Sequence, residues 1–463
     1  MATSVAHIQD VYHAQREFFR SGATRPYRFR KAQIKKLHSA IKEYEPQILE
    51  ALKQDLGKPE FEAYGSEVGY MYNEIRHTLR YLKDWMAVER EPTSIAHFPT
   101  RSKVYSVPKG QVLILAPWNY PFMLILDPLL GAMAAGNTAV LKLPSQTPHT
   151  SEIVDQMISK HFDERYIDTI RIDDTDIIPN LITGNFRFDH IFFTGSTRVG
   201  HLIMAAAAEK LIPVTLELGG KSPAIVDSTA DLKVTAKRII WGKAFNAGQT
   251  CIAPDHVFVH HEVKTPLLRR LELEADEVME KYGGLDGFSR IINLKRFETL
   301  LSYLDGQEEI SGGLVDADDL KLGLCIVDEP GMDSALMQEE IFGPILPVIA
   351  YTDEADLQEK LGQNPFPLAF YLFSKDRKKQ EELMQSVPFG GGCINNCLIQ
   401  ISNPYVPFGG IGTSGLGHYH GKKGFDTFSH KKSILKTGTW IDVPIRYVPY
   451  RAWKMKVLRL LFR

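Results

Sequence analysis

One cysteine lies in a sequence setting that suits covalent catalysis. Cys251 is in the loop FNAGQTCIAP (245–254), between a predicted helix and a predicted strand. A nucleophilic cysteine needs access and a stabilised thiolate, whereas most free thiols are buried structural residues. The nearest histidines lie in the following predicted strand, so the loop itself supplies no Cys–His pair: His256, His260 and His261. The loop therefore predicts either a nucleophile or a structural thiol.

Two further polar residues follow predicted strands. Glu217 begins ELGGKSP (217–223), where partial burial raises the pKa of a carboxyl and makes it a general base near neutral pH. Asn119, in APWNYP (116–121), follows the strand VLIL, and its amide N–H can stabilise the oxyanion of a tetrahedral intermediate. Each residue has a structural alternative, because most glutamates are solvated and asparagine commonly satisfies turns.

The segment FFTGSTRVG (192–200) is typical of a strand, a turn and a helix. Gly195 permits close approach of a ligand, the Ser196 hydroxyl can donate to an oxygen, and a helix N-terminus binds phosphate. The spacing from Gly195 to Gly200 is not G-x-G-x-x-G, and no Lys-Ser/Thr pair follows as in a P-loop. Alone, the segment fits phosphate binding and a simple strand–turn–helix equally well.

Two later segments carry weaker signals. In EEIFGP (339–344), Glu340 and Phe342 stand two residues apart, a spacing that can hold a ribose hydroxyl and wall an aromatic ring. A strand edge with a Gly-Pro turn explains the same residues structurally. The segment PFGGIGTSGLG (407–417) is rich in glycine, which predicts a shaped loop rather than a binding site.

Short β-rich runs alternate with helical patterns along the chain. Strands are predicted at QVLILAP, NTAVLKL, HIFFT, PVTLELG, SPAIVD and HVFVHH, and helices at residues 30–55, 66–90, 197–210 and 231–247 and at PLLGAMAAG, which ends at Gly136. This alternation predicts an α/β fold with doubly wound parallel sheets. Ligands of such folds bind at the carboxyl ends of strands. The segments above lie at such ends, which favours an enzyme over a structural protein.

Composition excludes several classes of protein. The 463 residues are 44% apolar and 24% charged, values typical of a globular protein with two or three domains. The net charge of −2 argues against affinity of the whole protein for nucleic acid. Four cysteines exclude a disulfide-stapled secreted scaffold. Cys393 and Cys397 lack the neighbouring ligands that a metal site needs, so we expect free thiols and no metal.

The two ends of the chain suggest where the protein is located. The N-terminus lacks the basic start and apolar run of a signal peptide, and Asp127 and prolines interrupt the apolar run 112–135. We therefore expect a cytoplasmic protein.

The tail, residues 446–463, has six basic and no acidic residues, and four apolar side chains share one helical face: Trp453, Val457, Leu460 and Leu461. Such a helix suits peripheral contact with an anionic membrane; a solvated or dimer-docked helix is the alternative.

Taken together and in order, six segments resemble the aldehyde dehydrogenase superfamily over about residues 30–435: PWNYP, FTGSTRVG, ELGGKSP, GQTC, EEIFGP and PFGGIGTSG. The phrases GQTCIAPD and YHGKKGFDTFSHKK are most similar to the class 3 branch, which includes fatty aldehyde dehydrogenases. The resemblance implies a homodimer and that family's fold. Its parts would be a Rossmann-like dinucleotide-binding domain (1–80 and 101–216), an α/β catalytic domain with the nucleophilic cysteine (217–405), and an oligomerisation hairpin with the C-terminal tail (81–100 and 425–463).

The resemblance also implies roles for matching residues. Cys251 would attack an aldehyde to form a thiohemiacetal, with the oxyanion held by Asn119 and the Cys251 backbone N–H. Hydride transfer to nicotinamide would leave a thioester, and Glu217 would activate the water that hydrolyses it. The remaining residues would line the dinucleotide site: Trp118, Lys142, Gly195, Ser196, Gly200, Glu340 and Phe342.

One departure from the family pattern bears on the coenzyme. The family commonly has Lys-Pro-Ser-Glu after the strand that ends at Lys142, and here Ser145 occupies the place of that Glu. Loss of a carboxylate removes repulsion of a 2′-phosphate, so we expect use of both NAD and NADP. The expected substrate is a medium- or long-chain aliphatic aldehyde, with aromatic aldehydes as a further class. The rival interpretations are a Cys hydrolase or acyltransferase and a non-catalytic protein that kept the fold.

Overall fold

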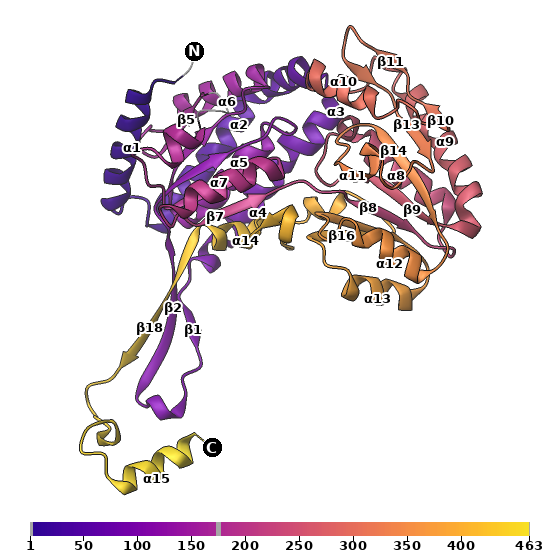
Figure 1. The fold of residues 1–463 in the computed structure, drawn as a ribbon. Coiled ribbons are helices and arrows are strands. Elements are labelled where there is room, and N and C mark those ends of the chain that lie inside the picture. The colour runs from indigo at the N-terminus through magenta and orange to yellow at the C-terminus, as the bar shows by residue number, and fades with distance from the viewer. Residues whose placement is uncertain (1–2, 173–176, 463) are drawn as a thin grey trace.

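The computed structural model describes residues 3–172 and 177–462. Figure 1 shows two lobes side by side and a slender arm that leads away from them to the C-terminal helix. Within the described residues the strands form sheets of six, seven and three strands and one two-stranded pair, β11 Val315–Asp316 with β12 Lys321–Leu322. The predicted α/β fold with doubly wound parallel sheets is confirmed.

The first lobe is built on a six-stranded sheet in the order β17-β7-β6-β3-β4-β5. Five strands run parallel, and β17 pairs antiparallel with β7. Strands β4 and β5 are added on one side of β3, and strands β6 and β7 on its other side. The crevice at the carboxyl ends of β3 and β6, where the strand order changes side, is therefore the expected ligand position. APWNYP follows β3, and GSTR follows β6. The strands are β3 Gln111–Leu115, β4 Thr138–Lys142, β5 Ile167–Ile170, β6 His190–Thr194, β7 Val214–Glu217 and β17 Gly415–Leu416.

Helices cover both faces of this sheet because β3 is apolar on both sides. Val112 and Ile114 belong to one core with α2, α5 and α6, while Leu113 and Leu115 belong to a second core with α1 and α7. Continuous apolar strands of this kind are typical of buried parallel sheets. The helices of this lobe are α1 Val5–Arg20, α2 Tyr27–Leu56, α3 Glu60–Ala63, α4 Gly69–Trp85, α5 Met123–Ala135, α6 Pro148–His161, α7 Thr197–Ala208 and α14 Gly421–Thr427.

The second lobe contains the seven-stranded sheet, in the order β10-β13-β14-β9-β8-β15-β16. All neighbours are parallel except β10, which pairs antiparallel with β13. The strands are β8 Pro223–Val226, β9 His256–His260, β10 Ile310–Gly312, β13 Cys325–Asp328, β14 Ile345–Tyr351, β15 Ala369–Phe373 and β16 Gly391–Ile394. The helices are α8 Leu232–Ala244, α9 Lys264–Lys281, α10 Leu294–Ser302, α11 Ala335–Gln338, α12 Glu354–Gly362 and α13 Arg377–Ser386.

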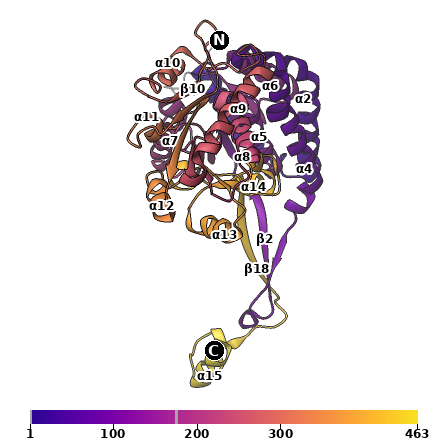
Figure 2. The same ribbon diagram turned by 90° about the vertical axis from the view of Figure 1, so that its right-hand side faces the viewer.

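The arm is a three-stranded antiparallel sheet of β1 Glu89–Glu91, β2 Thr100–Pro108 and β18 Ser429–Thr437. Its strand β2 continues beyond the range 81–100 that the resemblance assigned to the hairpin. The helix predicted over 66–90 ends at Trp85, because β1 gains ladder hydrogen bonds to β2 that the local sequence pattern does not reveal. Figures 1 and 2 show the arm extending from the lobes toward α15 Ala452–Leu461.

Most predicted helices occur where the sequence pattern placed them. The patterns over 30–55, 197–210 and 231–247 correspond to α2, α7 and α8. The pattern that ends at Gly136 corresponds to α5, where Gly136 has a φ of 92° and caps the last turn. A left-handed cap of this kind favours glycine. These helices bring the loops after β3 and β6 to a common edge of the first sheet.

Candidate functional site

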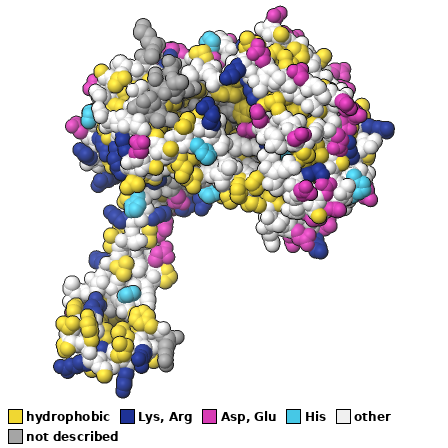
Figure 3. All heavy atoms as spheres, viewed as in Figure 1, with side chains coloured by type: hydrophobic (Ala, Val, Ile, Leu, Met, Phe, Trp, Pro, Cys, Tyr) yellow, Lys and Arg dark blue, Asp and Glu magenta, His cyan; other side chains and the backbone are white. Residues whose placement is uncertain are grey.

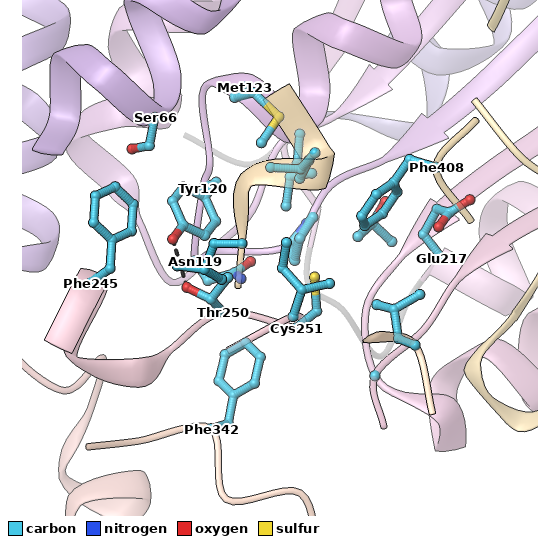
Figure 4. A pocket seen from close by; sticks show the side chains of 18 of the residues that line it. Ser66, Asn119, Tyr120, Met123, Glu217, Phe245, Thr250, Cys251, Phe342 and Phe408 are labelled. Atoms are coloured by element: carbon cyan, nitrogen blue, oxygen red, sulfur yellow. Dashed lines mark hydrogen bonds between the residues drawn. The ribbon is translucent and has the colours of Figure 1, made fainter. Parts of the chain in front are cut away.

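The carboxyl ends of the first sheet and the loops of the second lobe surround a cavity of about 530 Å³. Figure 4 shows its wall, with Asn119, Glu217 and Cys251 among the side chains drawn. Eight of the eleven residues named from the sequence line this cavity, although they are far apart in the chain: Trp118, Asn119, Gly195, Ser196, Glu217, Cys251, Glu340 and Phe342. The fold therefore brings the separate sequence segments to one place.

Cys251 follows a turn with an unusual backbone. Asn246 and Ala247 both have positive φ, of 52° and 50°, and Gly248 follows with 70°. Non-glycine residues avoid this region, so surrounding contacts must hold the turn. A Cβ on Gly248 would lie 2.3 Å from the Gly343 carbonyl oxygen, which explains glycine at that position. The turn presents the cysteine to the cavity instead of burying it in a helix.

The Cys251 thiol lies in an electrostatic setting that opposes ionisation. Burial raises its pKa above the usual value, and the nearby carboxyls of Glu340 and Glu217 raise it further. The resting side chain is therefore a neutral thiol at neutral pH. A base or a bound cation is needed before the sulfur becomes a thiolate, which is the nucleophilic form.

Asn119 is buried and tied to the loop that carries the cysteine. Its Nδ2 donates to the Gln249 carbonyl at 3.1 Å, and the neighbouring Tyr120 hydroxyl lies 2.6 Å from Thr250 Oγ1. A primary amide has two N–H groups. One N–H of Asn119 is thus used to hold its position, and the other is available to a ligand in the cavity.

Glu217 ends strand β7 and is buried without a hydrogen-bond partner for either carboxylate oxygen among the described residues. Burial raises its pKa well above the usual value. In Figure 4 its carboxyl group lies beside Phe408 and points away from Cys251. Two orphaned oxygens in a cavity wall indicate a group that acts on a ligand or water, because buried polar atoms are normally paired.

Another part of the cavity wall has features that suit the binding of an aromatic ring and a hydroxyl group. The rings of Trp118 and Phe342 meet edge to face, 5.4 Å between centroids. Glu340 lies over Gly219, where a Cβ would be 2.0 Å from its carboxylate. Burial raises the pKa of Glu340 to about 8. Arg296 fixes this segment by donating to the backbone carbonyl of Glu340 at 3.2 Å.

Gly195 and Ser196 form the turn between β6 and α7. The Gly195 N–H donates to the Glu217 carbonyl at 3.0 Å, and the Ser196 hydroxyl caps α7 by accepting from Val199 N–H. The buried Thr194 hydroxyl beside them, also in the cavity wall, has no hydrogen-bond partner among the described residues. This helix N-terminus is suited to an anionic group.

Three residues named from the sequence do not line the cavity. Lys142 is buried at the end of β4, and Ser145 is exposed three residues later. Gly200 lies inside α7, where a Cβ would be 2.5 Å from the Leu218 side chain, so its evident role is close packing of the helix.

Sequence reasoning missed the apolar part of the cavity wall. Some of these residues, such as Phe61 and Trp241, lie outside every motif, and their hydrophobic pattern is the same as that of core residues. Others, such as Tyr120 and Phe408, lie within the motifs, but the chemistry was assigned to their neighbours. Phe61, 88% exposed, and the partly exposed Trp241 show that apolar side chains also reach the protein surface there. The missed residues include Phe61, Tyr70, Tyr120, Met123, Trp241, Phe245, Thr250, Arg296, Phe408 and Tyr419.

Comparisons with known proteins match this architecture along nearly the whole chain. The aldehyde dehydrogenase family model matches residues 1–434. The 4,4'-diaponeurosporen-aldehyde dehydrogenase of Staphylococcus aureus (strain NCTC 8325 / PS 47) is 42% identical, over 98% of this chain and 99% of that protein. Aldehyde dehydrogenase family 3 member H1 of Arabidopsis thaliana is 40% identical, over 98% and 95%. The dimeric NADP-preferring aldehyde dehydrogenase of Rattus norvegicus is 37% identical, over 93% and 95%.

A solved structure agrees as well. The substrate-bound state of Staphylococcus aureus AldH superposes with a TM-score of 0.94 at 42% identity, covering 98% of this chain and 99% of that one. Motif order, fold and full-length similarity all lead to the same assignment. The chain belongs to the aldehyde dehydrogenase family, with class 3 homologues, and is an oxidoreductase that acts on the aldehyde group.

Proposed function

We propose that the enzyme oxidises medium- or long-chain aliphatic aldehydes to carboxylates, with aromatic aldehydes as a further class, and that Cys251 is its nucleophile. The observation that carries this proposal is the cavity itself. One wall holds Cys251, Asn119 and Glu217, and another is apolar and reaches the surface at Phe61 and Trp241. An apolar chain gains free energy by leaving water along such a wall.

In the proposed reaction the Cys251 thiol first loses its proton to water in the cavity. Its sulfur then bonds to the aldehyde carbon, and the carbonyl oxygen becomes an oxyanion. The second N–H of Asn119 and the Cys251 backbone N–H stabilise that oxyanion. Loss of a hydride from this adduct to a bound coenzyme would leave a thioester. Glu217 in its ionised form then takes a proton from the water that attacks the thioester, the carbon–sulfur bond breaks to release the carboxylic acid, and the sulfur regains a proton. Because Glu217 points away from Cys251, its side chain must rotate within the cavity to reach that water.

The family uses NAD or NADP, and the cavity wall carries groups that suit the nicotinamide end of a dinucleotide. The lining includes the orphaned Thr194 and Glu217 oxygens, the helix N-terminus at Ser196 and the Trp118–Phe342 ring pair. Glu340 and Phe342 would hold the nicotinamide ribose and ring. When bound, the coenzyme supplies the acceptor for the hydride of the tetrahedral adduct.

We further propose that the first lobe binds the coenzyme, the second supplies Cys251, and the arm makes a cytoplasmic homodimer. The exposed strand β18 lies at the free edge of the arm sheet, where it can pair with another chain.

A hydrolase or acyltransferase with the same cysteine would need no nucleotide, so the site at Trp118, Glu340 and Phe342 would serve no purpose. A scaffold protein would need none of the catalytic groups.

The tail adds a proposed membrane contact. Its helix α15 exposes Trp453, Val457, Leu460 and Leu461, while Lys454 folds inward and donates to the Tyr447 carbonyl. Figure 3 shows apolar and basic side chains gathered there. In the described part of the chain, no helix has the length and apolar character to cross a bilayer. We propose that the tail lies on an anionic membrane surface.

Aldehyde oxidation is tested by NADH formation along a series from butanal to hexadecanal. We expect kcat/KM to rise from the short to the medium and long chains, because each buried methylene contributes about 0.8 kcal/mol. Cys251→Ala should abolish NADH formation with every aldehyde. The lack of a signal with all aldehydes in the wild type would contradict the proposed function.

The state of the resting thiol is tested by alkylation with iodoacetamide. Because burial and two carboxyls raise the Cys251 pKa, the alkylation rate should rise about tenfold per pH unit from about pH 7 to about pH 9, following the thiolate fraction. Cys251→Ser provides the background from the other cysteines. A rate that levels off below pH 7 would show a low thiol pKa and refute the electrostatic interpretation.

Dual use of NAD and NADP is tested by kcat/KM for each coenzyme. We expect Ser145→Glu to weaken use of NADP at least tenfold and to leave NAD within about threefold, through repulsion of the 2′-phosphate. A wild-type preference for NAD above about 1,000-fold, roughly 4 kcal/mol, would contradict dual use.

Membrane contact is tested by co-sedimentation with liposomes that contain anionic lipid. Deletion of residues 446–463 should abolish binding, and added salt should weaken binding of the full chain because surface charges are screened. Equal sedimentation with and without the tail would reject the membrane proposal and leave dimer docking as the interpretation.

A further inference from the structure

A buried ion pair lies behind the Asn119 loop and outside the cavity lining. Lys58 follows helix α2, and Glu67 lies in the short helical segment Tyr64–Val68. Their side chains are both 0% exposed, and Lys58 Nζ lies 2.6 Å from Glu67 Oε1. Moving two charges out of water costs more free energy than their attraction usually returns. Stability alone is therefore a poor explanation for this pair.

Three further hydrogen bonds of the pair go to one loop. Lys58 Nζ donates to the Asn119 carbonyl at 3.2 Å. Glu67 Oε2 accepts from the backbone N–H groups of Phe122, at 2.9 Å, and Met123, at 3.3 Å. The ammonium group also lies 4.2 Å from the centre of the Tyr120 ring, in cation–π contact. The pair thus holds the loop at the proposed oxyanion donor and over the residues that follow it, up to the first turn of α5.

The same loop is bonded to the turn before the cysteine. Asn246 Nδ2 donates to the Asn119 carbonyl, the atom that Lys58 also contacts, at 3.1 Å. In return, Asn119 Nδ2 donates to the Gln249 carbonyl at 3.1 Å. Because Asn246 has a strained positive φ, this turn keeps its shape only while such contacts persist. The ion pair, Asn119 and the cysteine loop therefore form one connected unit.

We propose that Lys58 and Glu67 are positioning residues that orient Asn119 toward the Cys251 sulfur. They touch neither the substrate cavity nor the reacting atoms, and they act on the reaction through the Asn119 backbone. This inference rests on the proposed role of Asn119 in holding the oxyanion. Accurate placement of one hydrogen-bond donor matters greatly, because loss of such a donor slows acyl transfer by about 10²–10³.

The test compares the double variant Lys58→Met/Glu67→Gln, the single variant Asn119→Ala and the variant that combines all three changes. The measured quantity is the rate of NADH formation in a single turnover, together with the KM for coenzyme. We expect the double variant to be at least tenfold slower with a coenzyme KM within about threefold, and Asn119→Ala about 100-fold slower. The combined variant should be no slower than Asn119→Ala within about twofold, because residues that act as a unit are not additive.

A control separates positioning from general loss of stability. Gln15 is also fully buried and donates to the Ala139 carbonyl at 2.9 Å on the far side of the first sheet. Gln15→Leu should lower the melting temperature without slowing the single turnover. If the double variant does not fold, Glu67→Asp is used instead. It keeps both charges but shortens the side chain by one methylene, which draws the carboxylate away from the Phe122 and Met123 N–H groups, and it should give the same slow, non-additive behaviour.

The outcomes distinguish the two proposals. Multiplication of the rate losses in the combined variant, or a wild-type rate in both Glu67→Asp and the double variant, would overturn the positioning role and leave the proposed function intact. A wild-type rate in Asn119→Ala would refute the proposed role of Asn119, and the positioning proposal would fail with it.

Discussion

A reciprocal pair of hydrogen bonds between the Asn119 loop and the cysteine loop is the contact on which the site depends. The Asn119 amide donates to the Gln249 carbonyl, and the Asn246 amide donates to the Asn119 carbonyl. The first loop belongs to the six-stranded sheet and the second to the other lobe. Gln249 is itself fixed, because Ile292 N–H donates to its side-chain oxygen and its amide donates to the Arg290 carbonyl. The two lobes can therefore each supply one of the reacting groups, Asn119 and Cys251, and still hold these groups in accurate positions.

The electrostatics of the cavity also depend on these two loops being held together. Glu217 and Glu340 stand near the half-buried Cys251 thiol, and burial together with any negative charge on these carboxyls raises the pKa of that thiol. The carboxyls are affected too, since burial raises both pKa values. The direction of these shifts favours a neutral thiol, the form that resists oxidation and adventitious alkylation. Reactivity then has to be produced by what enters the cavity, which couples it to the presence of ligands.

The sequence predicted the helices and strands that have a clear hydrophobic pattern, and it predicted the site segments that contain unusual residues. Strand β3 and helix α5 were visible because apolar runs and the cap at Gly136 are local signals. Cys251 and Glu340 stood out because their neighbours are rich in glycine and proline. The wall at Trp241 could not be predicted, because an apolar side chain that faces a cavity has the same pattern as one in the core. Phe408 was missed because its glycine-rich segment predicted only a shaped loop. Strand β1 was missed for a related reason, since its hydrogen bonds come from a distant segment, β2.

The geometry of the arm determines what the tail can contact. Strands β2 and β18 pair over nine residues, from Thr100 with Thr437 to Pro108 with Ser429, a length of roughly 30 Å at 3.3–3.4 Å per residue. Acidic side chains are numerous on the second lobe, and basic ones gather on the tail (Figure 3). Opposite charges would draw the two together if the chain between them were flexible. A paired ladder is stiff, so it holds the tail away from its own lobes. Part of α15 stays with the arm, because Leu458 and Leu461 line a small cavity together with Ala96. The ladder therefore sets the distance from the lobes at which the remaining exposed apolar side chains of α15 can meet another surface.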